Sequence, residues 1–166
     1  MDELEIIFRM LAGTACGMAI GIDRDLRGKQ AGLRTLGLVG LGASVVAVTV
    51  ASDPVFAANA DAMSRVVQGV IQGVLAGVGF IGAGVVLHDS KAKAVYGLTT
   101  AAAVWLVAAL GIAAGLGAWR VVATGVVVGL VLLGIMHYVE RWVSPGDGDK
   151  KNSVVADDEK PDKDDA

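Results

Sequence analysis

The stretch VVQGVIQGVLAGVGFIGAGVVL, residues 66–87, decides the fold that the sequence predicts. It holds 22 residues without a formal charge, and a helix rising about 1.5 Å per residue crosses a hydrocarbon core of about 30 Å over such a length. Glycines recur at every fourth position, at Gly69, Gly73 and Gly77. Glycine inside a helix in water costs about 1 kcal/mol relative to alanine, whereas in lipid it lets two backbones approach closely. The stretch therefore predicts a central membrane-spanning helix.

Within this stretch, residues 77–82 (GVGFIG) match the G-x-G-x-x-G pattern of dinucleotide-binding turns. That pattern needs a preceding strand, a soluble βαβ unit and an acidic residue about 20 positions later. Here an apolar span precedes the pattern, and His88, Asp89 and two lysines follow it before the next apolar run. We therefore assign these glycines to helix packing rather than to a nucleotide site.

Hydrophobic residues make up 54% and charged residues 19% of the whole chain, and outside this stretch long uncharged runs alternate with short polar clusters. In a soluble domain, charged residues are instead interspersed among apolar ones, with the repeat of a helix or a strand. The pattern here is therefore not that of a soluble domain. Four further spans are expected, at residues 4–22, 35–52, 94–119 (helical from about 98 to 113) and 120–140. The sequence predicts an all-α, polytopic membrane bundle of about five glycine-rich transmembrane helices over residues 1–143. The glycines expected at helix contacts are Gly13, Gly17, Gly21, Gly69, Gly73, Gly77, Gly79, Gly82 and Gly84.

Residues 144–166 differ sharply in composition, with eight acids, four lysines and no aromatic residue. Such a segment cannot bury enough apolar surface to fold, so we predict a disordered acidic tail. The tail has a net charge of −4 and the rest of the chain +1, so the overall charge of −3 comes from the tail and indicates no nucleic-acid partner. Cys16 is the only cysteine, which excludes an intramolecular disulfide. No catalytic or metal-ligand spacing occurs, so the sequence predicts no enzyme, no cofactor and no metal site.

The basic residues of the short loops predict the orientation in the membrane, because lysine and arginine concentrate on the cytoplasmic side. With the N-terminus outside and the C-terminus in the cytoplasm, seven of them fall inside and two outside. The inner set is Arg24, Arg27, Lys29, Arg34, Lys91, Lys93 and Arg141, and the outer set is Arg65 and Arg120.

Four motifs in order resemble the N-terminal membrane domain of the MgtC/SapB family of bacterial inner-membrane proteins. They are IGIDRD at 20–25, AGLRT at 31–35, GVGFIGAG at 77–84 and GLTTAA at 97–102, within a resemblance covering roughly residues 8–118. Members often carry Glu-Arg-Glu where this chain has Asp-Arg-Asp, which keeps the charge but shortens the reach. Better-known members continue into a soluble ACT-type domain, whereas a short acidic tail follows the spans here, so we expect the membrane domain alone.

The resemblance implies a five-helix bundle, a setting of magnesium limitation, and for several members survival inside host cells under stress. It also implies modulation of other membrane machinery, such as ATP synthase or cation transport, rather than catalysis. We therefore expect a regulatory protein of the inner membrane that binds another integral membrane protein. The alternatives are a small ion transporter or channel, and a scaffold that forms homo-oligomers through its glycine faces.

Two polar clusters follow from this topology. The first lies at the cytoplasmic ends of the spans and is expected to act in docking or cation sensing, since hard cations prefer oxygen ligands, or else to orient the protein and cap helices. Its members are Asp23, Arg24, Asp25, Arg34, Thr35, Thr99 and Thr100. The second cluster is intramembrane and consists of Arg9, Gln68 and Gln72. Its members would lock the first span to the third by hydrogen bonds, or serve a functional site.

Thiol labelling tests the predicted orientation. A cysteine at Gly28 should be shielded from a membrane-impermeant thiol reagent in intact cells, whereas one at Asn59 should be labelled, because the two loops lie on opposite sides. Labelling of the Gly28 variant in intact cells would reverse the assignment of the first cluster to the cytoplasm.

Overall fold

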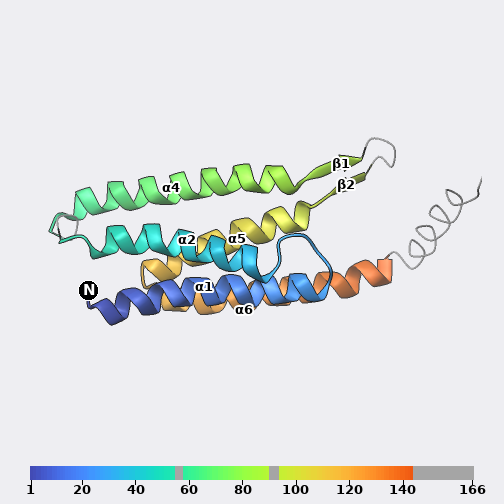
Figure 1. The fold of residues 1–166 in the computed structure, drawn as a ribbon, viewed down its shortest axis with the longest axis horizontal. Helices are drawn as coiled ribbons and strands as arrows, with labels where there is room; N and C mark the ends of the chain where they lie inside the picture. Colours follow the sequence, from blue (N-terminus) through green and yellow to red (C-terminus); the bar gives the residue numbers. More distant parts are fainter. Residues whose placement is uncertain (55–57, 90–93, 144–166) are drawn as a thin grey trace, which may run out of the picture. The chain divides into compact units, whose positions relative to one another are not determined.

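The computed structural model describes residues 1–54, 58–89 and 94–143, with side chains for 1–54, 58–86 and 97–135. The elements are α1 (Glu3–Leu26), α2 (Leu33–Ser52), α4 (Ala60–Val85), β1 (Leu87–Asp89), β2 (Ala94–Tyr96), α5 (Leu98–Gly115) and α6 (Trp119–Val143), as Figure 1 shows. The chain divides into two compact units, Met1–Leu130 and Val131–Ala166. The second unit holds the end of α6, and the predicted tail lies outside the described residues.

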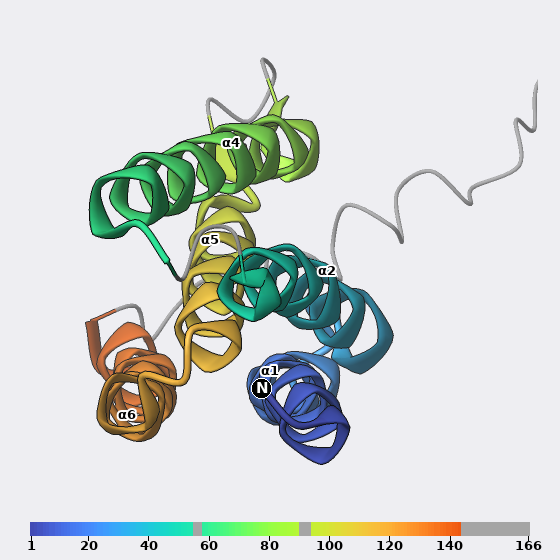
Figure 2. The same ribbon diagram turned by 90° about the vertical axis from the view of Figure 1, so that its left-hand side faces the viewer.

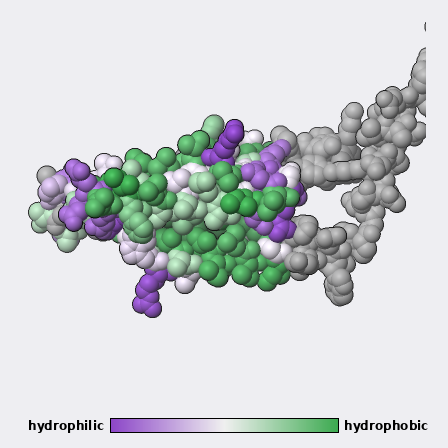
Figure 3. All heavy atoms as spheres, turned by 60° about the horizontal axis from the view of Figure 1, so that its bottom comes forward, coloured by the Kyte–Doolittle hydropathy of each residue, from purple (hydrophilic) through white to green (hydrophobic). Residues whose placement is uncertain are grey.

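In the part of the chain that the structure describes, four helices are long and apolar enough to cross a membrane. They are α1, α2, α4 and α5, with 24, 20, 26 and 18 residues, and residues Trp119–Ile135 of α6 form a shorter apolar helix. On the face in Figure 3, hydrophobic residues form a broad band, and hydrophilic residues gather at its ends. The prediction of an all-α, polytopic membrane protein is confirmed.

Two helices, α1 and α4, extend furthest beyond the spans that the sequence predicts. α1 continues through Asp25 to Leu26, where an ion pair between Asp23 and Arg27 supports its last turns. α4 begins at Ala60, where the predicted loop should still continue. The Asn59 side chain caps it by accepting hydrogen bonds from the amides of Asp61 and Ala62, at 3.1 and 3.0 Å. Hydropathy alone therefore misses turns that lie in the polar interface.

A short β-hairpin replaces the turn that the sequence predicts between the third and fourth spans. β1 pairs with β2 antiparallel, with Leu87 opposite Tyr96, so residues 94–96 of the run at 94–119 are extended. The helix that the sequence predicts from about residue 98 begins at Leu98. Gly97 precedes this helix and has a φ of 89°, a conformation that glycine adopts without strain. A Cβ here would also overlap the carbonyl oxygen of Val85.

The core of the first unit lies where α1, α2 and α5 meet. α1 runs antiparallel to α2, and Gly13, Gly17 and Gly21 of α1 all lie against the α2 segment that begins at Gly32. A Cβ at Gly17 would overlap the Leu36 carbonyl oxygen, and one at Gly13 would lie 2.7 Å from the Ser44 Cβ. The small residues of α1 therefore pack against a neighbouring helix.

The prediction that the third span is central is wrong, because α5 holds that position. In Figure 2, α5 lies between α4 and the pair formed by α1 and α2. In the 18-residue membrane window, 56% of α5 is buried but only 11% of α4. Of the six α4 glycines, only Gly82 has a neighbour, with Ala101 Cβ 3.4 Å from its Cβ position. The other five have open space within 4 Å: Gly69, Gly73, Gly77, Gly79 and Gly84.

The packed position of Gly17 and the open position of Gly77 predict opposite effects of replacing each glycine by alanine. Gly17→Ala should destabilise the protein, because the added methyl overlaps backbone, and overpacking typically costs 1–3 kcal/mol, about the range expected here. Gly77→Ala should leave stability unchanged or raise it, because alanine favours helix by about 1 kcal/mol and meets no atom. Thermal unfolding of both variants in detergent measures the difference. Equal loss in both would place Gly77 at a packed contact.

Candidate functional site

Arg24 joins the end of α1 to the beginning of α5. Its side chain is buried, with 2% exposed, and its guanidinium donates a hydrogen bond to the hydroxyl of Thr100, which is 3% exposed. Among the described residues, its Nε has no hydrogen-bond partner. The structure thus brings together two members of the predicted cytoplasmic cluster. Both are buried, so they position the site rather than form its surface.

Asp23 is paired within its own helix. Its Oδ1 accepts hydrogen bonds from Nε and Nη2 of Arg27, at 2.9 and 2.7 Å. Its Oδ2 is buried and lacks a partner in the described part of the chain. This carboxylate therefore orders the end of α1 next to Arg24.

Three further members of the cluster, Asp25, Arg34 and Thr35, line a cleft at the turn between α1 and α2. The cleft has a volume of about 400 Å³ and is lined by Asp25, Gly32, Leu33, Arg34 and Thr35. The Oδ2 of Asp25 accepts a hydrogen bond from the Leu33 amide at 2.9 Å, which closes the turn. A Cβ at Gly32 would overlap the Asp25 carboxylate. Asp25, Arg34 and Thr35 are all exposed, so the cleft presents both signs of charge.

Thr99 is exposed on the first turn of α5, one residue before the buried Thr100. No group of three or more His, Cys, Asp or Glu residues lies close enough to hold a metal ion in the parts of the chain that the structure describes. The chemistry that the cleft offers is recognition of charged and hydrogen-bonding groups.

The predicted intramembrane cluster does not form. Arg9 donates to Glu5 one turn earlier, with its Nε 3.1 Å from Oε1, and its Nη1 lies 3.0 Å from the Gly115 carbonyl oxygen. It therefore locks α1 to the end of α5 rather than to the third span. Gln68 and Gln72 of α4 are exposed, and among the described residues Arg9 hydrogen-bonds to Glu5 and Gly115 rather than to either glutamine. A chain reversal at Gly117, with a φ of 77°, lies against the Arg9 guanidinium.

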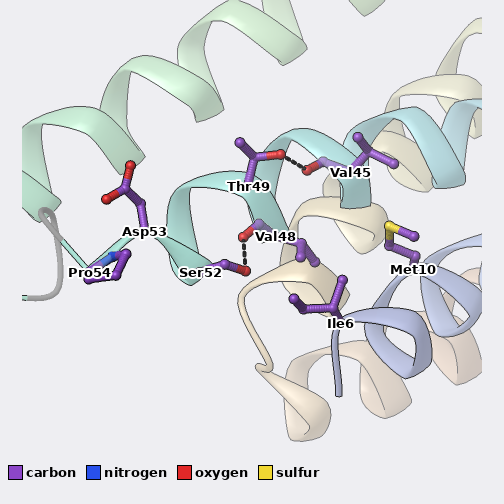
Figure 4. Close-up of a pocket in the computed structure, with 8 residues that line it drawn as sticks. All are labelled: Ile6, Met10, Val45, Val48, Thr49, Ser52, Asp53 and Pro54. Carbon is purple, nitrogen blue, oxygen red and sulfur yellow. Dashed lines mark hydrogen bonds between the residues drawn. The ribbon is translucent and has the colours of Figure 1, made fainter. Parts of the chain in front are cut away.

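A second pocket, of about 480 Å³, lies between α1 and α2 at the end that holds the N-terminus of α1. Figure 4 shows Ile6 and Met10 of α1 facing it from one side, and residues from Val45 to Pro54 from the other. The hydroxyls of Thr49 and Ser52 donate to backbone carbonyls of their own helix, at 2.8 and 2.7 Å. The pocket wall is therefore mainly apolar.

Two functional partners were missed by the sequence reasoning. Arg27 and Glu5 each lie four residues from the charged residue that they pair with. That spacing is the signal for a helical ion pair, and it was available in the sequence. The Gly115 carbonyl gave no such signal, because a backbone acceptor at a helix end has no side chain to mark it.

Comparison with known proteins identifies relatives in several bacteria. SrpB of Synechococcus elongatus is 44% identical over 119 residues, covering 66% of this chain and 63% of that protein. YhiD of Escherichia coli K12, named provisionally as a magnesium transporter, is 38% identical over 134 residues, covering 80% and 61%. MgtC of Salmonella typhimurium is 33% identical over 117 residues, covering 68% and 46%. The chain thus spans about half to two thirds of the length of these relatives.

No solved structure matches the chain. The profile of the MgtC family matches residues 10–142, a range that includes the α1–α2 cleft, the Arg24–Thr100 contact and most of every described helix. This protein therefore belongs to the MgtC family.

Proposed function

We propose that this protein regulates another integral membrane protein, and that the α1–α2 cleft is where that partner docks. The observation that carries the proposal is the exposure of Asp25 and Arg34 on a turn that is closed from within. A surface with both signs of charge fixes the register of a partner through complementary charges. The buried Arg24–Thr100 hydrogen bond holds the helix ends beneath it in place.

The proposed setting is magnesium limitation or acid and host stress, and the proposed partner is ATP synthase or cation-transport machinery of the bacterial inner membrane. The resemblance to the MgtC/SapB family supports this setting, as does the provisional name of YhiD. In the proposed topology the cleft faces the cytoplasm, where a partner's loops would reach it.

A magnesium or other cation transporter is the second candidate, supported by the name of YhiD. Transport requires a polar path across the membrane, whereas α1, α2 and α5 meet through glycine backbones. Arg9, the charged residue best placed to line such a path, is engaged by Glu5 and the Gly115 carbonyl. These contacts favour regulation over transport.

Arg34→Gln tests the docking proposal. In a strain that depends on this gene for growth at low magnesium, the variant should fail to support growth while accumulating normally in the membrane. An exposed substitution changes stability by only about 0.5 kcal/mol, so the loss should come from recognition. Growth rate and immunoblots of membrane fractions measure the two effects.

Arg120→Gln is the matched control, because Arg120 is equally exposed but lies at the opposite end of the helices. It should support normal growth. Normal growth of the Arg34→Gln strain would remove this residue from the docking site. If the Arg34→Gln protein does not accumulate and the strain does not grow, the growth defect comes from loss of the protein, and Arg34 stabilises the fold rather than binding a partner.

A further inference from the structure

One face of α4 carries polar groups where a membrane helix should present hydrocarbon. Gln68 and Gln72 are one turn apart. On their side of the helix the exposed Arg65 lies one turn before Gln68, and the residues that follow toward the end of α4 are small. This glutamine face consists of Gln68, Gly69, Gln72, Ala76, Gly79 and Ala83, all exposed. The face points away from α5, against which α4 packs through the buried Val78 and Gly82.

The depth of the two amides makes their exposure costly. α4 carries no charge from Val66 onward. Gln68 and Gln72 are the third and seventh residues of this uncharged run, so Gln72 lies about 9 Å along the helix from its first residue. Within the part of the chain that the structure describes, neither amide has a hydrogen-bond partner. Lipid tails supply no donors or acceptors, so polar side chains at this depth need partners from protein.

The chemistry of the face matches that of its own copy. A glutamine amide both donates and accepts hydrogen bonds, so two identical faces complement each other across a two-fold axis. Copies inserted in the same orientation also carry Gln72 at the same depth, so its counterpart lies at the level where a partner is needed. The residues around the amides leave space for close approach, since nothing lies within 4 Å of the Cβ positions at Gly69 and Gly79.

We propose that the protein forms a homodimer through the glutamine face of α4, in which Gln68 and Gln72 hydrogen-bond to the same residues of a second copy. This surface is separate from the α1–α2 cleft and independent of the proposed docking function. The small residues let the two α4 backbones approach, and the amides determine which helix faces meet.

Disulfide cross-linking in native membranes tests the proposal while both glutamines are retained. Cys16 is the only cysteine, so Cys16→Ala gives a background without thiols. In that background, Ala76→Cys should form an oxidised species of twice the monomer mass. Leu38→Cys should not, because Leu38 is 68% exposed but belongs to α2 rather than to the glutamine face.

A second comparison isolates the amides. Adding Gln68→Leu and Gln72→Leu to the Ala76→Cys protein should lower the cross-linked fraction about three-fold or more. Adding Val127→Leu and Val128→Leu instead should leave it unchanged, since both valines are exposed on α6. Immunoblots of total membrane protein show whether each variant accumulates.

Several results would overturn the proposal. Absence of cross-linking at Ala76, equal cross-linking at Leu38, or an Ala76 product containing a different protein would each exclude self-association through this face. An undiminished dimer in the leucine variant would exclude the amides as its cause. Failure of the leucine variant to accumulate would mean that the glutamines stabilise the single chain, which contradicts their assignment to an interface between copies.

Discussion

Three helix backbones meet at Gly40, and the arrangement of the first unit depends on that contact. A Cβ at Gly40 would overlap the carbonyl oxygen of Gly13 on α1. The carbonyl oxygen of Gly40 in turn lies 2.6 Å from the Cβ position of Gly111 on α5. In lipid there is no hydrophobic force to bring helices together, so the contacts made at such short range supply the attraction. Any side chain at these positions would separate the helices.

This central contact determines which residues meet at the two ends of the helices. Because α1 is antiparallel to α5 on either side of it, the end of α1 reaches the beginning of α5, where Arg24 donates to Thr100. At the other end, Arg9 reaches the Gly115 carbonyl oxygen. Both arginines lie near helix ends rather than mid-membrane, where a guanidinium would be most costly. The closed α1–α2 turn, and with it the cleft, is a consequence of the same packing.

The sequence predicted where helices lie better than what each helix faces. The uncharged runs placed α2 within two residues and predicted the helical part of α5, because hydropathy depends on composition alone. Glycines recur every fourth residue in both α1 and α4, and that spacing predicts a shared face. The spacing does not say what covers the face: a Cβ at Gly17 would overlap the α2 backbone, whereas one at Gly77 would have open space within 4 Å. Likewise, the charge of Arg9 predicted a partner but not that Glu5 and a backbone carbonyl would provide it.

The glycines of α1 pack against α2, whereas most glycines of α4 have open space beside them. A dimer and a docking partner would therefore use different surfaces. Among the described residues, the cleft at Asp25 and Arg34 is lined by residues at the α1–α2 turn and by none from α4, so a dimer through the glutamine face uses different residues from the docking site. Such a dimer carries two clefts related by its two-fold axis, both facing the same side of the membrane. A partner with repeated subunits could engage both clefts together, which raises the apparent affinity without any new contact. The weakly buried helix α4 would then contribute to regulation by pairing two docking sites rather than by touching the partner.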